Sequence, residues 1–496
     1  MRLLSKLADI RSGLNSGLKP DLHPQMPFLW EDGRNVRFTK GGVAKMLGWT
    51  SEKVHLVVTG NATMPRGGIA YIDGATEEFH FGNDTRIYTW DGTTLAPDAK
   101  AFTGVDKLWS FENWGSWVVA TNGIDAPVIY KGASYADLTG TPPATAEIML
   151  VNGAHMLAFN TDLDAKGYEW CHEDDIEDWV PTAANAAGSN LIREFTAEIV
   201  AAVPLGDNTA VYAGEKMAVV SSLGAPFYFG HKIAFQKGIS VYNKKCVASV
   251  GDLNIGLGAN GFFLTDGVSI TQLGEGEIAD TWRRDVNPAT YGKINSYHNS
   301  FTKEVIWYYA SGTATEPDKA IAYNYETNTL TFQDHGRLMA IGSETTETSS
   351  LFSKPLAIEK ATDVLDAWEI FKHNNGTDAD TSAMVVYIES KPYAIEDPDP
   401  RNPQTFEDFI KYVEAIKLYM GIFVSKGIKI KIGVKDSLDD ETYFGEVTQL
   451  ADPTIPIFPD ISGRWIILRV ESSELGDDWE LQGFAVHGSM TGGPPL

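Results

Sequence analysis

The feature of this chain that most constrains its fold is a series of short apolar or alternating runs, each ended by a turn dipeptide. Runs of four or five such residues bounded by Asp-Gly turns are typical of strands that enter β-hairpins. Three examples, each a run followed by its turn, are 69–72 with Asp73-Gly74, 86–90 with Asp91-Gly92, and 262–265 with Asp266-Gly267. The pattern extends over residues 51–345 and predicts an all-β fold there.

These hairpins also repeat weakly along the chain. In each copy an aromatic or apolar strand precedes a turn, and a further apolar residue follows the turn. The turn glycines Gly92 and Gly132 lie 40 residues apart, close to the ~40–50 residues of a four-stranded propeller blade. The form recurs at 263–270 and, more degenerately, at 323–330. A β-propeller of about six blades over residues 51–345 is the leading prediction, and a β-sandwich is the alternative.

A second domain is predicted after this region. Residues 342–350 are rich in Thr, Ser and Glu, a composition typical of an exposed link. The segments beyond this link alternate between apolar and polar residues, which indicates strands with one face in water and one on a core. They are 384–388, 428–432, 465–470 and 479–486. We therefore expect a β-sandwich-like platform domain over residues 346–496.

Two C-terminal segments are ambiguous. Residues 405–420 combine a capping-box pattern, Thr405 and Asp408, with β-branched and aromatic residues. They predict a short helical turn that runs into a strand. The proline-rich segment 391–403 predicts a stiff extended loop, either an interface arm or a crossing over the surface.

The charge of the chain is unevenly distributed. The formal net charge is −26, yet residues 1–50 carry eight Lys and Arg against four Asp and Glu. This segment predicts a basic N-terminal arm that docks on a partner, beside an acidic body. The body lacks the cations that bind DNA by releasing counterions, so tight DNA binding is not expected. Solubility alone explains the acidity equally well.

Cysteine content and hydropathy bear on the compartment. The chain has two cysteines, Cys171 and Cys246, and no apolar run follows its basic start as in a cleavable signal. We therefore expect synthesis in the cytoplasm with free thiols. No stretch approaches the ~18 consecutive apolar residues of a membrane helix.

The search for catalytic or cofactor motifs finds weak candidates. Residues 256–261 match the GxGxxG pattern of dinucleotide sites, but a strand and a hairpin turn follow where that site needs a helix. A tight turn between strands is the better interpretation. The histidines are scattered, and no GxSxG motif occurs. We expect no enzymatic activity and no cofactor.

An acidic loop, residues 171–179, concentrates metal-capable side chains without a zinc-like spacing. A divalent ion on its carboxylates is one interpretation, and a solvated loop closed by Trp179 is the other. The candidate residues of this loop are Asp174, Asp175, Glu177 and Asp178.

Three stretches together resemble one family. Residues 35–49, residues 177–188 with the strands at 210–220, and residues 256–273 are similar to segments of the tail hub or nozzle (tail tubular) proteins of short-tailed bacteriophages. The resemblance spans about residues 35–275 and, faintly, 479–486. These motifs are structural, and they carry no catalytic residue to transfer.

The resemblance implies a structural protein of the virion tail. Such a subunit would form a homohexameric ring, attach to the head-to-tail adaptor, meet tail fibre or spike proteins, and form the channel through which dsDNA is ejected. An acidic channel would repel phosphate, so that DNA slides through it. Candidate interface residues in the basic arm are Arg2, Lys6, Arg11, Lys19, Arg34 and Arg37.

Two other functions remain open. The 13 Trp and 19 Tyr can stack on sugars, which would suit a carbohydrate-binding or receptor-binding β-propeller of the virion. Cations near the N-terminus would suit a tail component that binds dsDNA. They are Arg2, Lys6, Arg11 and Lys19.

Overall fold

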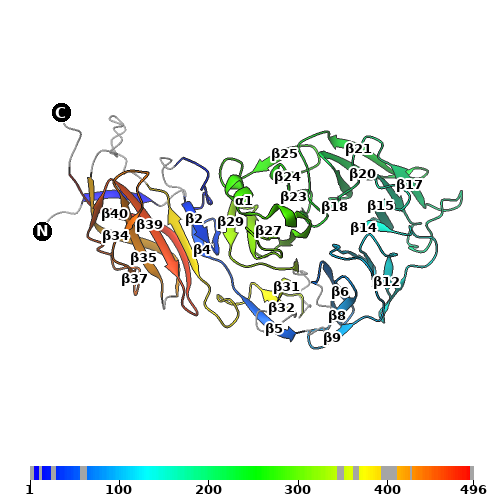
Figure 1. Cartoon of the computed structure of the whole chain (residues 1–496), viewed down its shortest axis with the longest axis horizontal. Helices are drawn as coiled ribbons and strands as arrows, with labels where there is room; N and C mark the ends of the chain where they lie inside the picture. Colours follow the sequence, from blue (N-terminus) through cyan, green and yellow to red (C-terminus); the bar gives the residue numbers. More distant parts are fainter. Residues whose placement is uncertain are drawn as a thin grey trace.

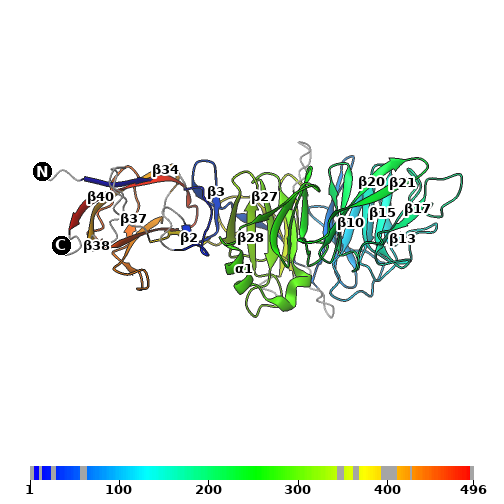
Figure 2. The same ribbon diagram turned by 90° about the horizontal axis from the view of Figure 1, so that it is seen from above.

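The computed structural model describes residues 5–10, 14–23, 30–55, 64–342, 351–360, 368–392, 410–424 and 427–491. Two β-domains lie side by side along the long axis of the molecule, a propeller and a sandwich, as Figures 1 and 2 show from perpendicular directions. Nearly all the regular structure is antiparallel sheet.

The propeller consists of seven four-stranded antiparallel sheets. Blade 1 contains β6 (Gly68–Asp73), β7 (Thr76–Gly82), β8 (Ile87–Trp90) and β9 (Leu95–Pro97). Blade 2 contains β10 (Ser110–Trp114), β11 (Trp117–Thr121), β12 (Val128–Tyr130) and β13 (Tyr135–Asp137). Blade 3 contains β14 (Ala146–Asn152), β15 (His155–Thr161), β16 (Gly167–Trp170) and β17 (Gly188–Leu191). Blade 4 contains β18 (Ala201–Leu205), β19 (Asn208–Ala213), β20 (Lys216–Gly224) and β21 (Tyr228–Phe235).

The remaining blades follow in chain order, with one exception. Blade 5 contains β22 (Val247–Val250), β23 (Leu253–Gly258), β24 (Gly261–Thr265) and β25 (Ile270–Leu273). The short helices α1 (Ala279–Asp285) and η1 (Pro288–Lys293) lead to blade 6, which contains β26 (Asn295–Asn299), β27 (Glu304–Tyr309), β28 (Lys319–Asn324) and β29 (Thr329–Gln333). Blade 7 contains β30 (Met339–Ile341), β31 (Leu356–Lys360), β32 (Trp368–His373) and, from the other end of the chain, β5 (Trp49–His55).

The first strands of the seven blades form a closed ring. Each contacts the first strand of the next blade, from β6 through β10, β14, β18, β22 and β26 to β30, and β30 contacts β6. The β-propeller fold predicted from the sequence is therefore confirmed, with seven blades where about six were expected. The seventh blade was missed because its outer strand, β5, lies more than 300 residues from its partner β32.

The repeated hairpin predicted from the sequence is also confirmed. The turns at Gly92, Gly132 and Gly267 all join the third strand of a blade to its fourth, and Asn328 occupies the same place in blade 6. All four residues have positive φ, between 56° and 92°, which explains why glycine or asparagine stands there. The GxGxxG segment forms the hairpin between β23 and β24, as expected.

The sandwich contains two six-stranded sheets. The first sheet contains β3 (Val36–Phe38), β4 (Val43–Lys45), β40 (Asp478–Thr491), β34 (Ile410–Val424), β38 (Ile461–Gly463) and β1 (Ser5–Ile10), which also pairs with β40. The second contains β2 (Trp30–Arg34), β33 (Val386–Ser390), β39 (Trp465–Ser472), β35 (Lys429–Lys435), β36 (Tyr443–Phe444) and β37 (Thr448–Gln449). Both sheets thus combine strands from the two ends of the chain.

The domain boundaries differ from the prediction. Residues 1–50 are not a separate arm, because β1 to β4 are sandwich strands and β5 belongs to blade 7. The propeller continues past residue 345 through β31 and β32, and the sandwich resumes at β33. The Thr/Ser/Glu-rich stretch 343–350 falls between β30 and β31 and lies outside the described residues.

The ambiguous C-terminal segments are described only in part. The strand expected within 405–420 is β34, whereas the expected helical turn before it falls within 393–409, which lies outside the described residues. Most of the proline-rich segment 391–403 lies there as well.

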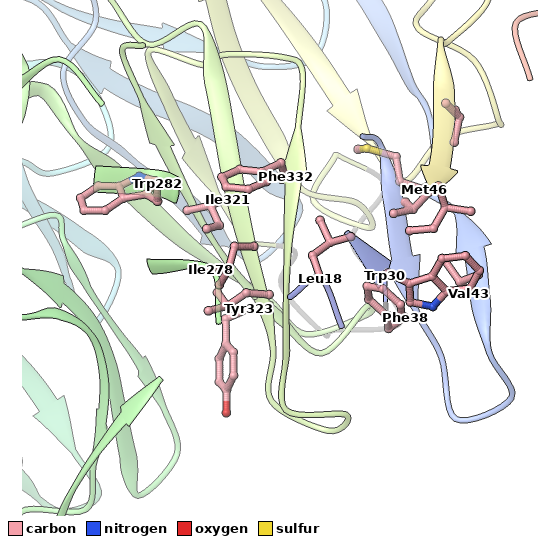
Figure 3. Packing of buried hydrophobic residues seen from close by; sticks show 14 of the residues in the cluster. Leu18, Trp30, Phe38, Val43, Met46, Ile278, Trp282, Ile321, Tyr323 and Phe332 are labelled. Atoms are coloured by element: carbon pink, nitrogen blue, oxygen red, sulfur yellow. The ribbon is translucent and has the colours of Figure 1, made fainter. Parts of the chain in front are cut away.

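The two domains meet at blade 6. Strands β2 and β3 contact β29, and Figure 3 shows Leu18, Trp30 and Phe38 on the sandwich side facing Ile321 and Phe332 of blade 6. The link is also polar, through one buried residue. The N–H of Asn35 donates to the Phe332 carbonyl (3.1 Å), its Oδ1 accepts from the Asp334 N–H (2.8 Å), and its Nδ2 donates to the Val385 carbonyl (2.8 Å). Apolar and polar contacts together fix the sandwich to the propeller.

Candidate docking surfaces and an axial cavity

Two of the predicted basic interface residues, Lys19 and Arg34, lie at this domain junction. Lys19 pairs with Glu277 beside blade 5. Arg34 donates to Asp32 Oδ1 (2.8 Å), lies 3.4 Å from Asp334, and has its guanidinium 4.8 Å from the centre of the Phe332 ring.

Arg37 donates from Nε to the Lys45 carbonyl (3.2 Å), within the β3–β4 hairpin. Arg34 and Lys19 therefore hold the sandwich against the propeller, and neither extends as a free arm. The backbone of Lys6 lies in β1, while Arg2 and Arg11 lie outside the described residues.

The acidic loop joins β16 to β17 in blade 3, and two of its carboxylates, Glu177 and Asp178, accept hydrogen bonds from neighbouring side chains. Glu177 accepts from Lys131 Nζ (2.9 Å) and Thr139 Oγ1 (2.5 Å). Asp178 accepts two contacts from Asn185 Nδ2 at 2.9 and 3.0 Å. The interpretation as a solvated loop closed by a tryptophan fits this geometry, because Trp179 is buried and donates to the Ile176 carbonyl (2.6 Å).

The two other acidic candidates, Asp174 and Asp175, are exposed. Asp174 has a positive φ of 55°, and Asp175 accepts from the Glu177 N–H (3.0 Å). Within the described residues, no group of three or more His, Cys, Asp and Glu is arranged to hold a metal ion.

Four large apolar side chains of one sandwich segment, residues 443–458, are exposed. The segment from β36 to β38 runs from the edge of β35 across to β34, where Ile457 exchanges two backbone hydrogen bonds with Ile416 (2.7 and 2.8 Å). Ile457 is buried, but other large apolar residues of the same segment are not: Tyr443 is 69% exposed and Phe458 67%. We call this surface the apolar side of the sandwich; its members are Tyr443, Val447, Ile455 and Phe458.

A second exposed apolar feature lies on the propeller, away from the sandwich (Figure 1). The β20–β21 hairpin carries Leu223 and Phe227 near its tip, the latter 74% exposed. Between this hairpin and the turns of blades 4 and 5 lies a groove of about 750 Å³, whose rim includes Asp207, Asp252 and Val268.

The tryptophans are distributed as core residues. Eleven of the 13 are buried. The other two, Trp114 and Trp117, are half-buried neighbours across the β10–β11 hairpin, where Lys131 Nζ lies 4.5 Å from the Trp117 ring centre. None of the 13 tryptophans is exposed, so none offers an open ring face on which a sugar could stack.

The axis of the propeller holds a cavity of about 440 Å³ lined by the first strands of all seven blades. Three charged residues line it: Glu112 from β10, and Lys244 and Lys245 from the link between blades 4 and 5. Lys244 is buried and pairs with Glu147 Oε1 (2.9 Å). Lys245 forms no salt bridge with any residue that the structure describes.

The surroundings of the cavity shift the pKa values of Glu112 and Lys245. Burial raises the pKa of Glu112 to about 8, although the Val151 backbone N–H and the charge of Lys245 act in the opposite direction. Burial, helped by Lys244, lowers the pKa of Lys245 to about 8, although Glu112 opposes this. Neither residue was predicted from the sequence. The available indication was that Glu112 and Lys245 are charged residues next to apolar ones, Phe111 and Cys246, within or beside a strand.

Both cysteines are buried. Cys171 and Cys246 are free thiols, and burial raises the pKa of each to about 12, so neither supplies a thiolate at neutral pH. In the part of the chain that the structure describes, no helix is long and apolar enough to cross a membrane.

Comparisons with known proteins identify no family. No family model matches the sequence, and no curated protein matches it. Among solved structures, the computationally designed protein Ika8 aligns with 66% of this chain and 99% of its own, at 9% identity and a TM-score of 0.37. BamB from Moraxella catarrhalis aligns with 75% of this chain and 98% of its own, at 10% identity and a TM-score of 0.35. Likeness at this level does not bear on function.

Proposed function

We propose that this protein is a structural subunit of the tail nozzle of a short-tailed bacteriophage. Six copies form a ring that attaches to the head-to-tail adaptor, meets fibre or spike proteins, and surrounds the path of ejected dsDNA. The sequence resemblance suggested this role, and the surface of the molecule supports it.

The observation that carries the proposal is the apolar side of the sandwich. The net charge of −26 favours solubility. Large exposed apolar residues on one segment act against solubility, so a contact with another protein explains them better. Tyr443 and Phe458 are each about two-thirds exposed; Tyr443 lies in β36, at the edge of the second sheet, and Phe458 shortly precedes β38, at the edge of the first. Aromatic residues of this kind are enriched at the centres of protein interfaces. We assign this surface to contact with the neighbouring copy in the ring.

In this proposal the DNA path lies outside the individual propeller. A volume of about 440 Å³ is typical of a small-molecule site and cannot admit a duplex. DNA would therefore pass between copies, through the centre of the ring. Net negative charge on the subunits would keep the phosphate backbone from adhering to the wall.

The alternative function, carbohydrate or receptor binding, has weaker support. It was motivated by the number of aromatic residues, but eleven of the 13 tryptophans are buried. Among the tryptophans, the half-buried pair Trp114 and Trp117 is the remaining place for a sugar to stack.

Electron microscopy tests the proposal. The full chain would be imaged alone and together with its head-to-tail adaptor, and six-fold rings with a central channel are expected in at least the second sample. Phe458→Asp should prevent ring formation, because it buries a carboxylate at the contact. Val105→Asp is the matched control: Val105 is 71% exposed in a propeller loop, and its substitution should leave the rings intact.

The outcomes separate the candidate functions. Monomers in both samples would contradict the nozzle role. A glycan array that retains the protein, with retention lost in Trp117→Ala, would then favour the receptor-binding alternative. Rings that form equally well with Phe458→Asp would keep the nozzle role but remove the apolar side of the sandwich as its contact.

A further inference from the structure

The axial cavity contains two opposite charges that do not contact each other. Glu112 enters from blade 2 and Lys245 from the link before blade 5, and both line the same space. They are close enough for each to influence the ionisation of the other, yet no salt bridge joins them. Both side chains are half-buried, and charged groups withdrawn from water are normally paired directly. Glu112 accepts from the Val151 backbone N–H, whereas no salt bridge engages Lys245 among the described residues, so the space beside its ammonium can take a polar occupant.

Lys245 is held in position by the surrounding blades. Its backbone N–H donates to Asn243 Oδ1 (2.7 Å), and its carbonyl accepts from Ser296 Oγ of β26 (2.7 Å). Asn243 is anchored in turn by donating to the Ile294 carbonyl (2.9 Å). The backbone that carries the ammonium is thus fixed by blade 6, as a preorganised binding group requires.

The charge balance of the cavity favours an anion. Lys244 is neutralised by Glu147. His298, which also lines the cavity, lies 3.1 Å from the Tyr325 hydroxyl, and burial followed by the charge of Lys303 lowers its pKa, so it is neutral at pH 7. With the pKa of Glu112 raised to about 8, its carboxyl is mostly protonated at that pH. Lys245, still mostly charged, leaves an excess of one positive charge in a protein of net charge −26.

We propose that the axial cavity binds a small hydroxylated monocarboxylate, such as a sugar acid. Its carboxylate accepts from the Lys245 ammonium and the Glu112 carboxyl. Its hydroxyl groups meet Ser249, Ser300 and the inner edges of the first strands, which line the cavity. A volume of about 440 Å³ suits a ligand of this size. This inference does not rest on the proposed nozzle function.

Calorimetric titration of the full chain with D-gluconate tests the proposal, in a buffer free of carboxylate and phosphate. One site per chain is expected at neutral pH. Lys245→Met should weaken binding about tenfold or more, because a charge-assisted hydrogen bond is lost. Lys237→Met is the matched control, since Lys237 is exposed outside the cavity and its loss should change nothing.

The pH dependence supplies a second readout. Between about pH 7 and pH 9, Lys245 loses its proton and Glu112 becomes anionic, so both changes should weaken gluconate binding. Glu112→Gln retains a donor without acquiring charge. It should bind gluconate near neutral pH and show a shallower loss of affinity on raising the pH.

Neutral and minimal ligands complete the test. D-glucitol carries the same hydroxyl groups without the carboxylate and should not bind measurably, whereas acetate should bind more weakly than gluconate. The NMR signal of isotopically dimethylated Lys245 should shift when gluconate is added, which reports on the cavity even if Lys245→Met misfolds. No binding at millimolar gluconate, equal binding of glucitol, or an unmoved Lys245 signal would each overturn the proposal.

Discussion

Arg66 shows how one side chain helps to close the propeller ring. It is 3% exposed and donates through both terminal nitrogens to Glu316, at 2.7 and 2.8 Å. Arg66 precedes blade 1, while Glu316 lies between β27 and β28 of blade 6. Arg66→Met should lower the free energy of unfolding by about 2 kcal/mol, less than for a fully buried pair because Glu316 is 25% exposed and keeps Lys293.

Urea denaturation followed by tryptophan fluorescence measures this loss. Lys100→Met provides the control, because its pair with Asp137 is largely exposed and should contribute at most about 1 kcal/mol. If the two substitutions lowered the free energy of unfolding equally, Arg66 would contribute no more than an exposed ion pair.

The same pair has a pH signature. Burial alone would raise the pKa of Glu316, but hydrogen bonds and charge from Arg66 and Lys293 lower it overall. A carboxyl with a lowered folded-state pKa contributes stability above its unfolded pKa, about 4.3, and loses that contribution as the pH falls through the folded value. The free energy of unfolding should therefore fall on acidification below about pH 5, and less steeply in Arg66→Met. Parallel pH profiles of the two proteins would argue against the coupling.

At the scale of elements, β5 determines whether blade 7 is complete. Its first residue, Trp49, is buried against His335 and His373, at ring separations of 4.6 and 5.9 Å, with the Arg337 guanidinium 4.8 Å from its ring. Trp49→Ala should cost about 3–5 kcal/mol through the cavity that it leaves. Hydrogen exchange should accelerate in β30 to β32 more than in blades 2–4.

The matched control is Trp117→Ala. Trp117 is half-buried at a hairpin of blade 2, so its loss should cost less and leave exchange in blade 7 unchanged. Uniformly faster exchange across all seven blades in Trp49→Ala would show that β5 stabilises the whole propeller and not blade 7 in particular.

The elements that sequence reasoning identified are those with local causes. Hairpin turns such as Asp91-Gly92 and Asp266-Gly267 are encoded within a few residues, and the structure confirms them in equivalent places of their blades. Blade 7 and the sandwich depend on pairings between distant strands, such as β5 with β32 and β1 with β40. Local periodicity carries no information about such partners.

The candidate site was less predictable for a related reason. Lys19 and Arg34 have the composition of a basic arm, but their partners Glu277 and Asp334 come from the propeller, nearly 260 and 300 residues away. Likewise, the proximity of Glu112 and Lys245 arises only when blades 2 and 5 face the common axis. The residue types and their spacing in the sequence predicted neither the ion pairs at the domain junction nor the charged groups in the cavity.

For the whole molecule, net charge predicts weak interaction with DNA. The chain carries −26 formal charges, and its described N-terminal cations Lys19 and Arg34 are engaged with internal acids. At about 0.15 M salt, a gel-shift assay with duplex DNA should show no retained complex. Retention that persists at this salt and disappears when residues 1–20 are deleted would support the DNA-binding alternative.

The pairing of the two chain ends has a consequence for biosynthesis. Strand β1 (Ser5–Ile10) pairs with β40 (Asp478–Thr491), so β1 remains unpaired during translation until residues 478–491 have been made. At ~5–20 residues per second, translation imposes a delay of roughly 25–100 s. During this interval β1 lacks its partner, and its unpaired backbone is open to aggregation or chaperone capture. A chain released before residue 478 lacks β40 and cannot complete the first sheet of the sandwich, so such a stalled translation product would be left without a stable second domain.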